Sequence, residues 1–184
     1  MNEIINEHVS IIKQLQTNIS QINKVADHLY DCLTRSNGKV LLMGNGGSAA
    51  DCQHIAAELV VRYINNRKAL PAIALTTDTS ILTAVANDFG YDSVFARQIE
   101  ALATPNDIVI GITTSGKSQN IIEGFKAASK LGAYTIGLTG KHDEQLKSIT
   151  QELIKVPSEK TARIQEAHIF IGHLLCELID EKFE

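Results

Sequence analysis

Apolar residues recur every three or four positions through the beginning of the chain. They are Ile5, Val9, Ile12, Leu15, Ile19, Ile22, Val25 and Leu29. This spacing is that of one face of an α-helix, so the pattern predicts a long amino-terminal helix over residues 1–35. The apolar face either forms oligomer contacts with a partner subunit or covers the chain's own core, and the sequence leaves both open.

Short, continuous apolar runs alternate with helical patterns through residues 36–184. The runs predict strands at 39–43, 72–75, 107–113, 134–139 and 153–156. Helical patterns lie at 48–63, 80–87, 92–102, 118–131 and 161–183. A run such as Ile108–Ile112 is apolar throughout, which is typical of a parallel sheet with helices on both faces. The pattern predicts one α/β domain over residues 1–184, with a doubly wound, five-stranded parallel sheet flanked by helices.

The composition of the chain narrows the functional classes. With 184 residues, 44% of them apolar and 21% charged, the chain is typical of one soluble globular domain. A net charge of −4 argues against nucleic acid as a partner. No apolar run suits a membrane span, and the first residues do not resemble a signal peptide. Cys32, Cys52 and Cys176 suggest no disulfide framework, so a cytoplasmic protein is expected.

The first predicted strand leads into the glycine-rich sequence GNGGSA, which spans Gly44 to Ala49. Glycines let the backbone turn tightly, and the free amides of a helix that starts there attract anions. The stretch therefore predicts a site for a phosphorylated small molecule. It also fits the GxGxxA dinucleotide fingerprint, which needs an acidic residue at the end of the next strand. Asp78 is the nearest candidate but comes late, so a dehydrogenase is the weaker alternative.

The third predicted strand leads into a second polar loop, TTSGKSQN, which ends at Asn120. It carries hydroxyl groups at Thr113, Thr114, Ser115 and Ser118, beside the amides of a new helix. A phosphate monoester suits such a cup because its oxygens accept many hydrogen bonds at once. The alternative is an ordinary helix start capped by Ser118. Four hydroxyl groups exceed what a cap requires, so we favour a phosphate site.

Two helices carry further candidate chemistry. His54 and Glu58 are four residues apart in the predicted helix 48–63, so they share one face. Such a pair can bind zinc or act as acid and base, although alone it is more often a solvated surface pair. Gln165 and His173 lie on the last helix, where eight residues separate their heights by about 12 Å. That separation is near the limit for binding one ion, and His173 alone would be typical of a core histidine.

The pair Asn87 and Asp88 ends the predicted helix 80–87, shortly before Gly90. This arrangement is typical of a helix that simply stops at a glycine. Short polar side chains at a helix end are also well suited to contact sugar hydroxyls. The residues alone leave both interpretations open.

Together these stretches resemble the sugar isomerase (SIS) family, and within it the branch that acts on heptose phosphates. The resemblance covers nearly the whole chain through GNGGSAADCQHIAAEL, AND, TTSGKSQNI and RIQEAHIFIGHLLCELID. It implies the SIS fold and an aldose–ketose isomerase that converts sedoheptulose 7-phosphate to D-glycero-D-manno-heptose 7-phosphate. That reaction is an early step towards the heptose of bacterial lipopolysaccharide. The resemblance also implies a homotetramer with sites at subunit interfaces and one zinc ion per subunit.

The resemblance also implies a role for each motif. The phosphate would be held by Thr113, Thr114, Ser115 and Ser118, with Ser48 assisting. The sugar chain would be contacted by Asn45, Gly46, Gly47, Asn87 and Asp88, and by Glu58 and Gln165. The zinc ion would be surrounded by His54, Glu58, Gln165 and His173. Lys117 departs from the family pattern, in which a small polar residue is usual at this position.

An isomerase of this kind needs a base for a weakly acidic C–H bond, an acid for the oxygens and stabilisation of an enediolate. We expect Glu58 to be the base, because partial burial among apolar neighbours would raise its pKa. We expect His173 to be the acid. Zinc would polarise the carbonyl, and the loops would fix the far end of the substrate.

Two functions without catalysis compete with this prediction. One is a non-catalytic SIS protein that binds a partner protein such as the bacterial replication initiator. The presence of His54, Glu58 and His173 together favours an enzyme, because a scaffold needs none of them. The other is a transcriptional regulator that senses a sugar phosphate, for which 184 residues leave no room for a DNA-binding domain.

Overall fold

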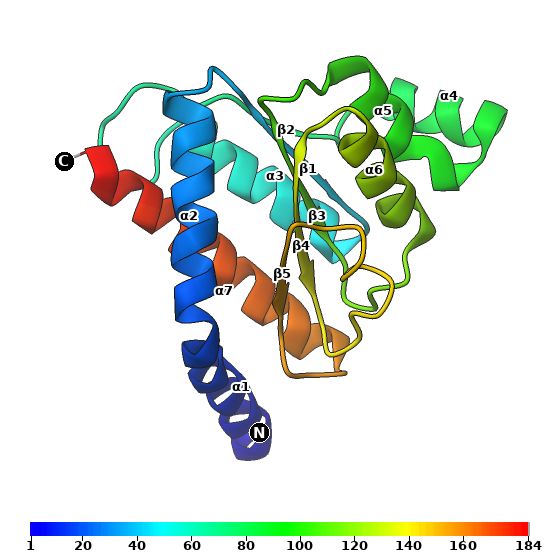
Figure 1. Ribbon diagram of the computed structural model, residues 1–184. Coiled ribbons are helices and arrows are strands. Elements are labelled where there is room, and N and C mark those ends of the chain that lie inside the picture. Colours follow the sequence, from blue (N-terminus) through cyan, green and yellow to red (C-terminus); the bar gives the residue numbers. More distant parts are fainter. Residues whose placement is uncertain (184) are drawn as a thin grey trace.

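The computed structural model describes residues 1–183, which form a parallel sheet with helices on both faces (Figure 1). The strands are β1 (Val40–Gly44), β2 (Ala72–Ala74), β3 (Ile108–Ile112), β4 (Tyr134–Thr139) and β5 (Glu152–Lys155). Their order is β2-β1-β3-β4-β5, and each neighbouring pair is parallel. The predicted doubly wound, five-stranded sheet is therefore confirmed.

The helices cover the sheet in two layers. They are α1 (Asn2–Gln14), α2 (Ile19–Thr34), α3 (Gly47–Val60), α4 (Thr79–Phe89), α5 (Val94–Leu102), α6 (Gln119–Lys130) and α7 (Thr161–Asp180). On one face α2, α3 and α7 pack on alternate strand residues such as Leu42 and Ile110. On the other face α5 and α6 pack on Leu41 and Val109. This alternation explains the continuous apolar runs, because both faces of each central strand are buried.

The amino-terminal helix is long, as predicted, but a 3-10 turn at Leu15–Asn18 interrupts it. The hydroxyl group of Thr17 donates to the carbonyl oxygen of Gln14 at 2.8 Å, a local bond of the kind that competes with helical pairing. Beyond the turn, α2 covers the core and buries Val25 completely. Before it, α1 extends away from the sheet (Figure 1) and leaves Ile5 54% exposed. Most of the cover over the chain's own core therefore comes from α2, while α1 adds Ile11 at its carboxyl-terminal end.

The helix predicted over residues 48–63 ends earlier, at Val60. The guanidinium group of Arg67 donates to the carbonyl oxygens of Glu58 and Leu59, both at 2.9 Å. These two carbonyls belong to the last turn of α3, where helical partners are missing. The helix is thus closed by a side chain from further along, which helical periodicity does not reveal.

The sheet order places the two polar loops side by side. The strands β1 and β3 are neighbours. From β1 the chain goes first to β2 at one edge of the sheet, and then returns through β3 and β4 to β5 at the other edge. Ligands of open α/β sheets bind at this kind of switch point, beside the carboxyl ends of the strands.

Along residues 1–183, no helix combines the length and apolarity needed to cross a membrane.

Candidate active site

The loop after β3 gathers hydroxyl groups around Thr113, which is only 4% exposed. The Oγ1 atom of Thr113 lies 3.0 Å from the Ser118 Oγ atom and 3.5 Å from the Ser115 Oγ atom. Ser115 also accepts a hydrogen bond from the backbone amide of Lys117 at 3.1 Å. Thr114, by contrast, has no recorded bond to this group among the described residues. Three of the four predicted phosphate ligands therefore converge.

Ser118 occupies the N-cap position of α6, but its side chain makes no capping hydrogen bond. The side chain instead contacts Thr113. Among the described residues, the Gln119 and Asn120 amides at the start of α6 are thus left for an anion, whereas the Ile121 amide donates to the Ser118 carbonyl.

A glycine shapes this loop from behind. Gly116 has a φ of +66°, and a Cβ atom there would collide with the carbonyl oxygen of His142. That oxygen accepts a hydrogen bond from Thr139 Oγ1 at 2.9 Å, which fixes it at the end of β4. The hydroxyl cup is therefore supported by the neighbouring strand.

The loop after β1 is joined to the hydroxyl loop by a pair of amide side chains. Asn45 and Asn120 exchange two hydrogen bonds, each 2.9 Å long. Tyr91 donates its hydroxyl to the Asn45 Oδ1 atom at 3.1 Å. The sequence predicted a substrate contact for Asn45 but gave no role to Asn120 or Tyr91, because their meeting depends on the strand order.

The start of α3 meets the last helix. Gly46 has a φ of +55°, which lets the chain turn into α3. The side chain of Gln165 packs where a Cβ atom of Gly47 would stand, so only glycine permits this approach. Ser48, which was expected to assist with the phosphate, is only 3% exposed. Gln165 therefore lies at the loop end of α3.

His54, Glu58 and His173 come together further along the same two helices. The Nε2 atoms of His54 and His173 are 2.8 Å apart, and His54 Nε2 lies 3.4 Å from Glu58 Oε1. Gly172 allows this contact, because a Cβ atom there would stand 2.6 Å from Ile55 Cδ1. The side chains of His54 and Glu58 are 46% and 23% exposed, so the cluster is open to a ligand.

The residue types of this cluster are ones that bind zinc, but their present geometry is not that of a metal site. As the side chains stand, residues 1–183 contain no group of three His, Cys, Asp or Glu side chains arranged to hold a metal. Two nitrogen ligands of tetrahedral zinc lie about 3.4 Å apart, given bonds of about 2.0–2.1 Å. His54 and Glu58 already have this spacing, whereas the two imidazoles are too close and form a hydrogen bond. A shared ion would require the two imidazoles to move apart.

Comparisons with known proteins identify the family of this arrangement. The model of the SIS domain matches residues 4–140. The chain belongs to the SIS family.

Within that family, the most similar proteins share one name. A phosphoheptose isomerase of Aquifex aeolicus is 57% identical over 88% of the chain and 84% of its own length. A phosphoheptose isomerase of Campylobacter jejuni is 51% identical over 96% of the chain and 95% of its own length. The solved phosphoheptose isomerase of Neisseria gonorrhoeae superposes with a TM-score of 0.90 at 39% identity, covering 98% of this chain and 96% of that one. The chain is thus a member of the phosphoheptose isomerase group of SIS proteins.

The sugar contacts that the SIS resemblance implies for Asn87 and Asp88 stay a prediction. Both residues lie exposed at the end of α4, where Asn87 Nδ2 donates to Asp88 Oδ1 at 2.7 Å. Among residues 1–183, no hydrogen bond joins either of them to the two loops. Asp78, the acidic residue weighed for a dinucleotide, instead caps α4 by accepting the Ile81 amide at 2.9 Å. This role explains Asp78 without a nucleotide.

Two buried titratable residues of this SIS domain were not selected from the sequence. Asp51 lies three residues before His54, and its Oδ2 atom is buried without a hydrogen-bond partner among the described residues. Burial raises the pKa of Asp51 to about 6, and His54 offsets part of that effect. His168 is completely buried, and burial lowers its pKa to about 4. Only burial distinguishes these residues, so the helical pattern could not have identified them.

Proposed function

We propose that this protein is a sugar-phosphate isomerase that converts sedoheptulose 7-phosphate to D-glycero-D-manno-heptose 7-phosphate. The observation that carries the proposal is the combination of a hydroxyl cup after β3 with the cluster of His54, Glu58 and His173. The names of the most similar proteins support the same activity. A protein that only binds partners has no use for two imidazoles and a carboxylate in contact.

The hydroxyl cup, formed by Thr113, Ser115 and Ser118, binds the phosphate at the far end of the substrate. Its hydroxyl groups and the open amides of α6 hold the phosphate, and binding energy there positions the reacting carbons. The first two carbons of the ketose then undergo the reaction. A proton leaves C1, an enediolate forms, and a proton is added to C2, while the O2 atom gains a proton and the O1 atom becomes the new carbonyl.

Glu58 takes the proton from C1 and returns it to C2, because a carboxylate can act on both neighbouring carbons from one side. His173 moves protons at the oxygens, and its contact with His54 fixes the direction of its Nε2 atom. A zinc ion held by His54, Glu58 and His173 would polarise the substrate carbonyl and stabilise the enediolate charge.

The site is proposed to be completed between subunits of a homotetramer. Along α3, His54 lies about 10 Å and Glu58 about 16 Å from the loop at Gly47. Gln165 packs at the loop end of α3, and along α7 it lies about 12 Å from His173, which is more than two helix turns. The cup and Gln165 of one subunit would therefore serve the histidine cluster of another. The exposed apolar residues of α1 provide a surface for such assembly.

Incubation with sedoheptulose 7-phosphate in D2O tests this function. We expect deuterium to enter the aldose at C2, which NMR can follow over time. The rate of deuterium entry should fall after chelation and recover with added zinc. No deuterium entry with or without zinc would overturn the isomerase. Exchange that chelation leaves unchanged would remove zinc from the proposal while keeping the reaction.

A further inference from the structure

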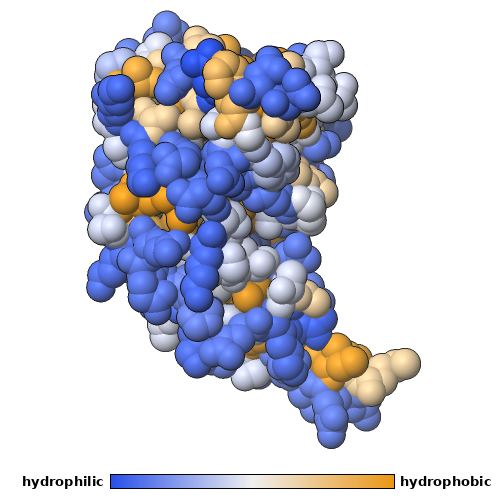
Figure 2. Space-filling view, turned by 90° about the vertical axis from the view of Figure 1, so that its right-hand side faces the viewer, coloured by the Kyte–Doolittle hydropathy of each residue, from blue (hydrophilic) through white to orange (hydrophobic). Residues whose placement is uncertain are grey.

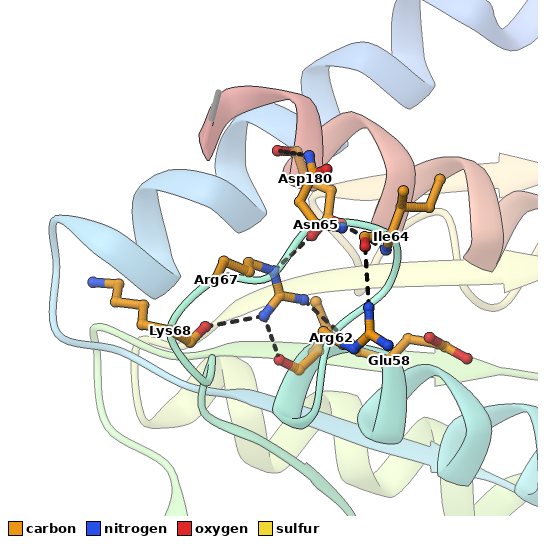
Figure 3. Close-up of polar contacts among 8 residues, drawn as sticks. Glu58, Arg62, Ile64, Asn65, Arg67, Lys68 and Asp180 are labelled. Atoms are coloured by element: carbon orange, nitrogen blue, oxygen red, sulfur yellow. Dashed lines mark hydrogen bonds and ion pairs between the residues drawn. The ribbon is translucent and has the colours of Figure 1, made fainter.

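A buried ion pair joins the ends of the two helices that carry the histidine cluster. Arg67 Nε donates to Asp180 Oδ1 at 2.6 Å, and the two side chains are 2% and 3% exposed (Figure 3). Asp180 is the last residue of α7, seven positions after His173. Arg67 lies in the segment 61–70 that follows α3, which we call the strap. The pair therefore connects α7 to the strap.

The remaining hydrogen bonds of Arg67 hold the end of α3. One terminal nitrogen of its guanidinium group donates to the Glu58 carbonyl, and the other donates to the carbonyls of Leu59 and Lys68. Glu58 is thus fixed through its own backbone. A cation is also favourable at the carboxyl end of a helix.

The carboxylate of Asp180 holds the strap in turn. Its Oδ2 atom accepts the backbone amides of Ile64 and Asn65, both at 2.8 Å. The strap then places the ring of Tyr63 with its centroid 6.0 Å from that of His173. Figure 3 shows the strap running between the last turns of α3 and α7.

Stability alone is a poor reason for such a pair. Removing two charges from water costs free energy, and well-packed apolar residues of similar volume often replace a buried pair without loss. A pair that joins the end of α3, the end of α7 and the strap between them instead fixes the distance between the two helix ends. Here that distance sets how His54 and Glu58 meet His173.

We infer that Arg67 and Asp180 are positioning residues of the isomerase site, which hold the ends of α3 and α7 so that Glu58, His54 and His173 stay in contact. This inference rests on the proposed function for its kinetic consequence. Its geometric consequence, the contact between the two imidazoles, is independent of it.

The substitution D180N tests the inference, with D107N as the matched control. Asp107 is also a buried carboxylate, and it accepts two backbone amides and a lysine ammonium group. Its partners, Lys39 and Thr104, belong to neither α3 nor α7. Both substitutions should lower the melting temperature. The milder change R67K serves if D180N does not fold.

Three readouts on the full-length protein separate positioning from stability. We expect D180N to shift the histidine side-chain NMR signals of His54 and His173, to weaken zinc binding in a chelator competition about 10-fold, and to lower kcat more than it changes KM. D107N should leave all three near the wild-type values. Equal effects of the two substitutions, or no effect of D180N, would overturn the inference. If the wild type did not isomerise the sugar, the proposed function would fail. The histidine signals would still test whether Arg67 and Asp180 position the two helices.

Discussion

At the scale of single residues, the site depends on one carboxylate beside a pair of histidines, with His54 in contact with both Glu58 and His173. Glu58 lies in the last turn of α3, with its side chain 23% exposed and 3.4 Å from His54 Nε2. Its carboxylate contacts His54, which in turn contacts His173, so Glu58 is the group expected to take a proton from a substrate bound beside them. The partly exposed Glu123 on α6 offers a comparison, because it pairs with Lys126 away from the cluster.

The substitution Glu58→Gln should keep substrate binding and remove turnover. Glutamine preserves the shape but has no basic oxygen pair, so we expect kcat to fall roughly 10²–10⁴-fold, as for loss of a general base. Calorimetry should still show binding of sedoheptulose 7-phosphate. Glu123→Gln is the control and should be active. Turnover of Glu58→Gln close to that of the wild type would exclude Glu58 as the base.

His168 makes folding stability depend on pH. Its ring is completely buried, and burial lowers its pKa to about 4, an effect that a contact with the Thr139 backbone partly offsets. The unfolded chain binds a proton there below about pH 6.5, whereas the folded protein does so only near pH 4. Stability is therefore complete above pH 6.5 and is lost as the pH falls towards 4.

The substitution His168→Leu should flatten this dependence. A shift from 6.5 to about 4 corresponds to about 3 kcal/mol of unfolding free energy between pH 7 and pH 4. Urea unfolding at both pH values measures it for wild type and variant. The control is His142→Gln, at an exposed histidine. Its unfolding free energy should change between pH 7 and pH 4 as much as that of the wild type. An equal change of unfolding free energy with pH in the wild type and in His168→Leu would contradict the lowered pKa of His168.

At the scale of elements, the sequence predicted most of the sheet and less of the site. Continuous apolar runs locate buried strands well, because burial of both faces leaves no polar position. The end of α3 and the link between Asn45 and Asn120 were missed for a different reason. Asn120 lies 75 residues from Asn45, and the strand order brings the two together. Arg67 lies only nine residues from Glu58, but the irregular segment between them has no periodicity from which the contact could be predicted.

The amide link predicts a coupled defect of the two loops. Asn120 is 3% exposed, and Asn120→Ala removes two hydrogen bonds of Asn45 in a partly buried place. The Asn45 Nδ2 atom loses its described partner, while the Oδ1 atom keeps the Tyr91 hydroxyl. We expect about 1–3 kcal/mol lower stability and a higher KM for the sugar phosphate. Denaturant unfolding and steady-state kinetics measure both. The exposed Gln119→Ala is the control, and an unchanged KM in Asn120→Ala would show that the link does not support the cup.

At the scale of the whole molecule, apolar surface remains on the amino-terminal helices. Ile4, Ile5 and Ile19 are each more than half exposed. A groove of about 280 Å³ between these helices and α7 is lined by apolar side chains that include Phe170 and Leu174. Figure 2 shows apolar side chains at the end of the projecting α1. A surface of this kind is expected to be covered by another subunit.

Charges on this surface should dissociate the assembly. In the double variant Ile5→Glu and Ile19→Glu, each new carboxylate would have to lose its water in an apolar interface. Light scattering after gel filtration should show a tetramer for the wild type and smaller species for the variant. Leu102→Glu, an exposed apolar position on α5, is the control. A wild-type monomer would refute the proposed assembly.

Shared sites predict that two inactive variants restore activity when mixed. One variant carries Glu58→Gln, and the other replaces the cup hydroxyls through Thr113→Val and Ser118→Ala. If the cup of one subunit serves the cluster of another, random hybrids regain about a quarter of the sites with both halves intact. Coexpression, followed by the deuterium assay, measures the recovery. Each variant alone should stay inactive, so recovery requires exchange of subunits. If every site were built within one chain, each hybrid site would keep one defect and the mixture would show no gain.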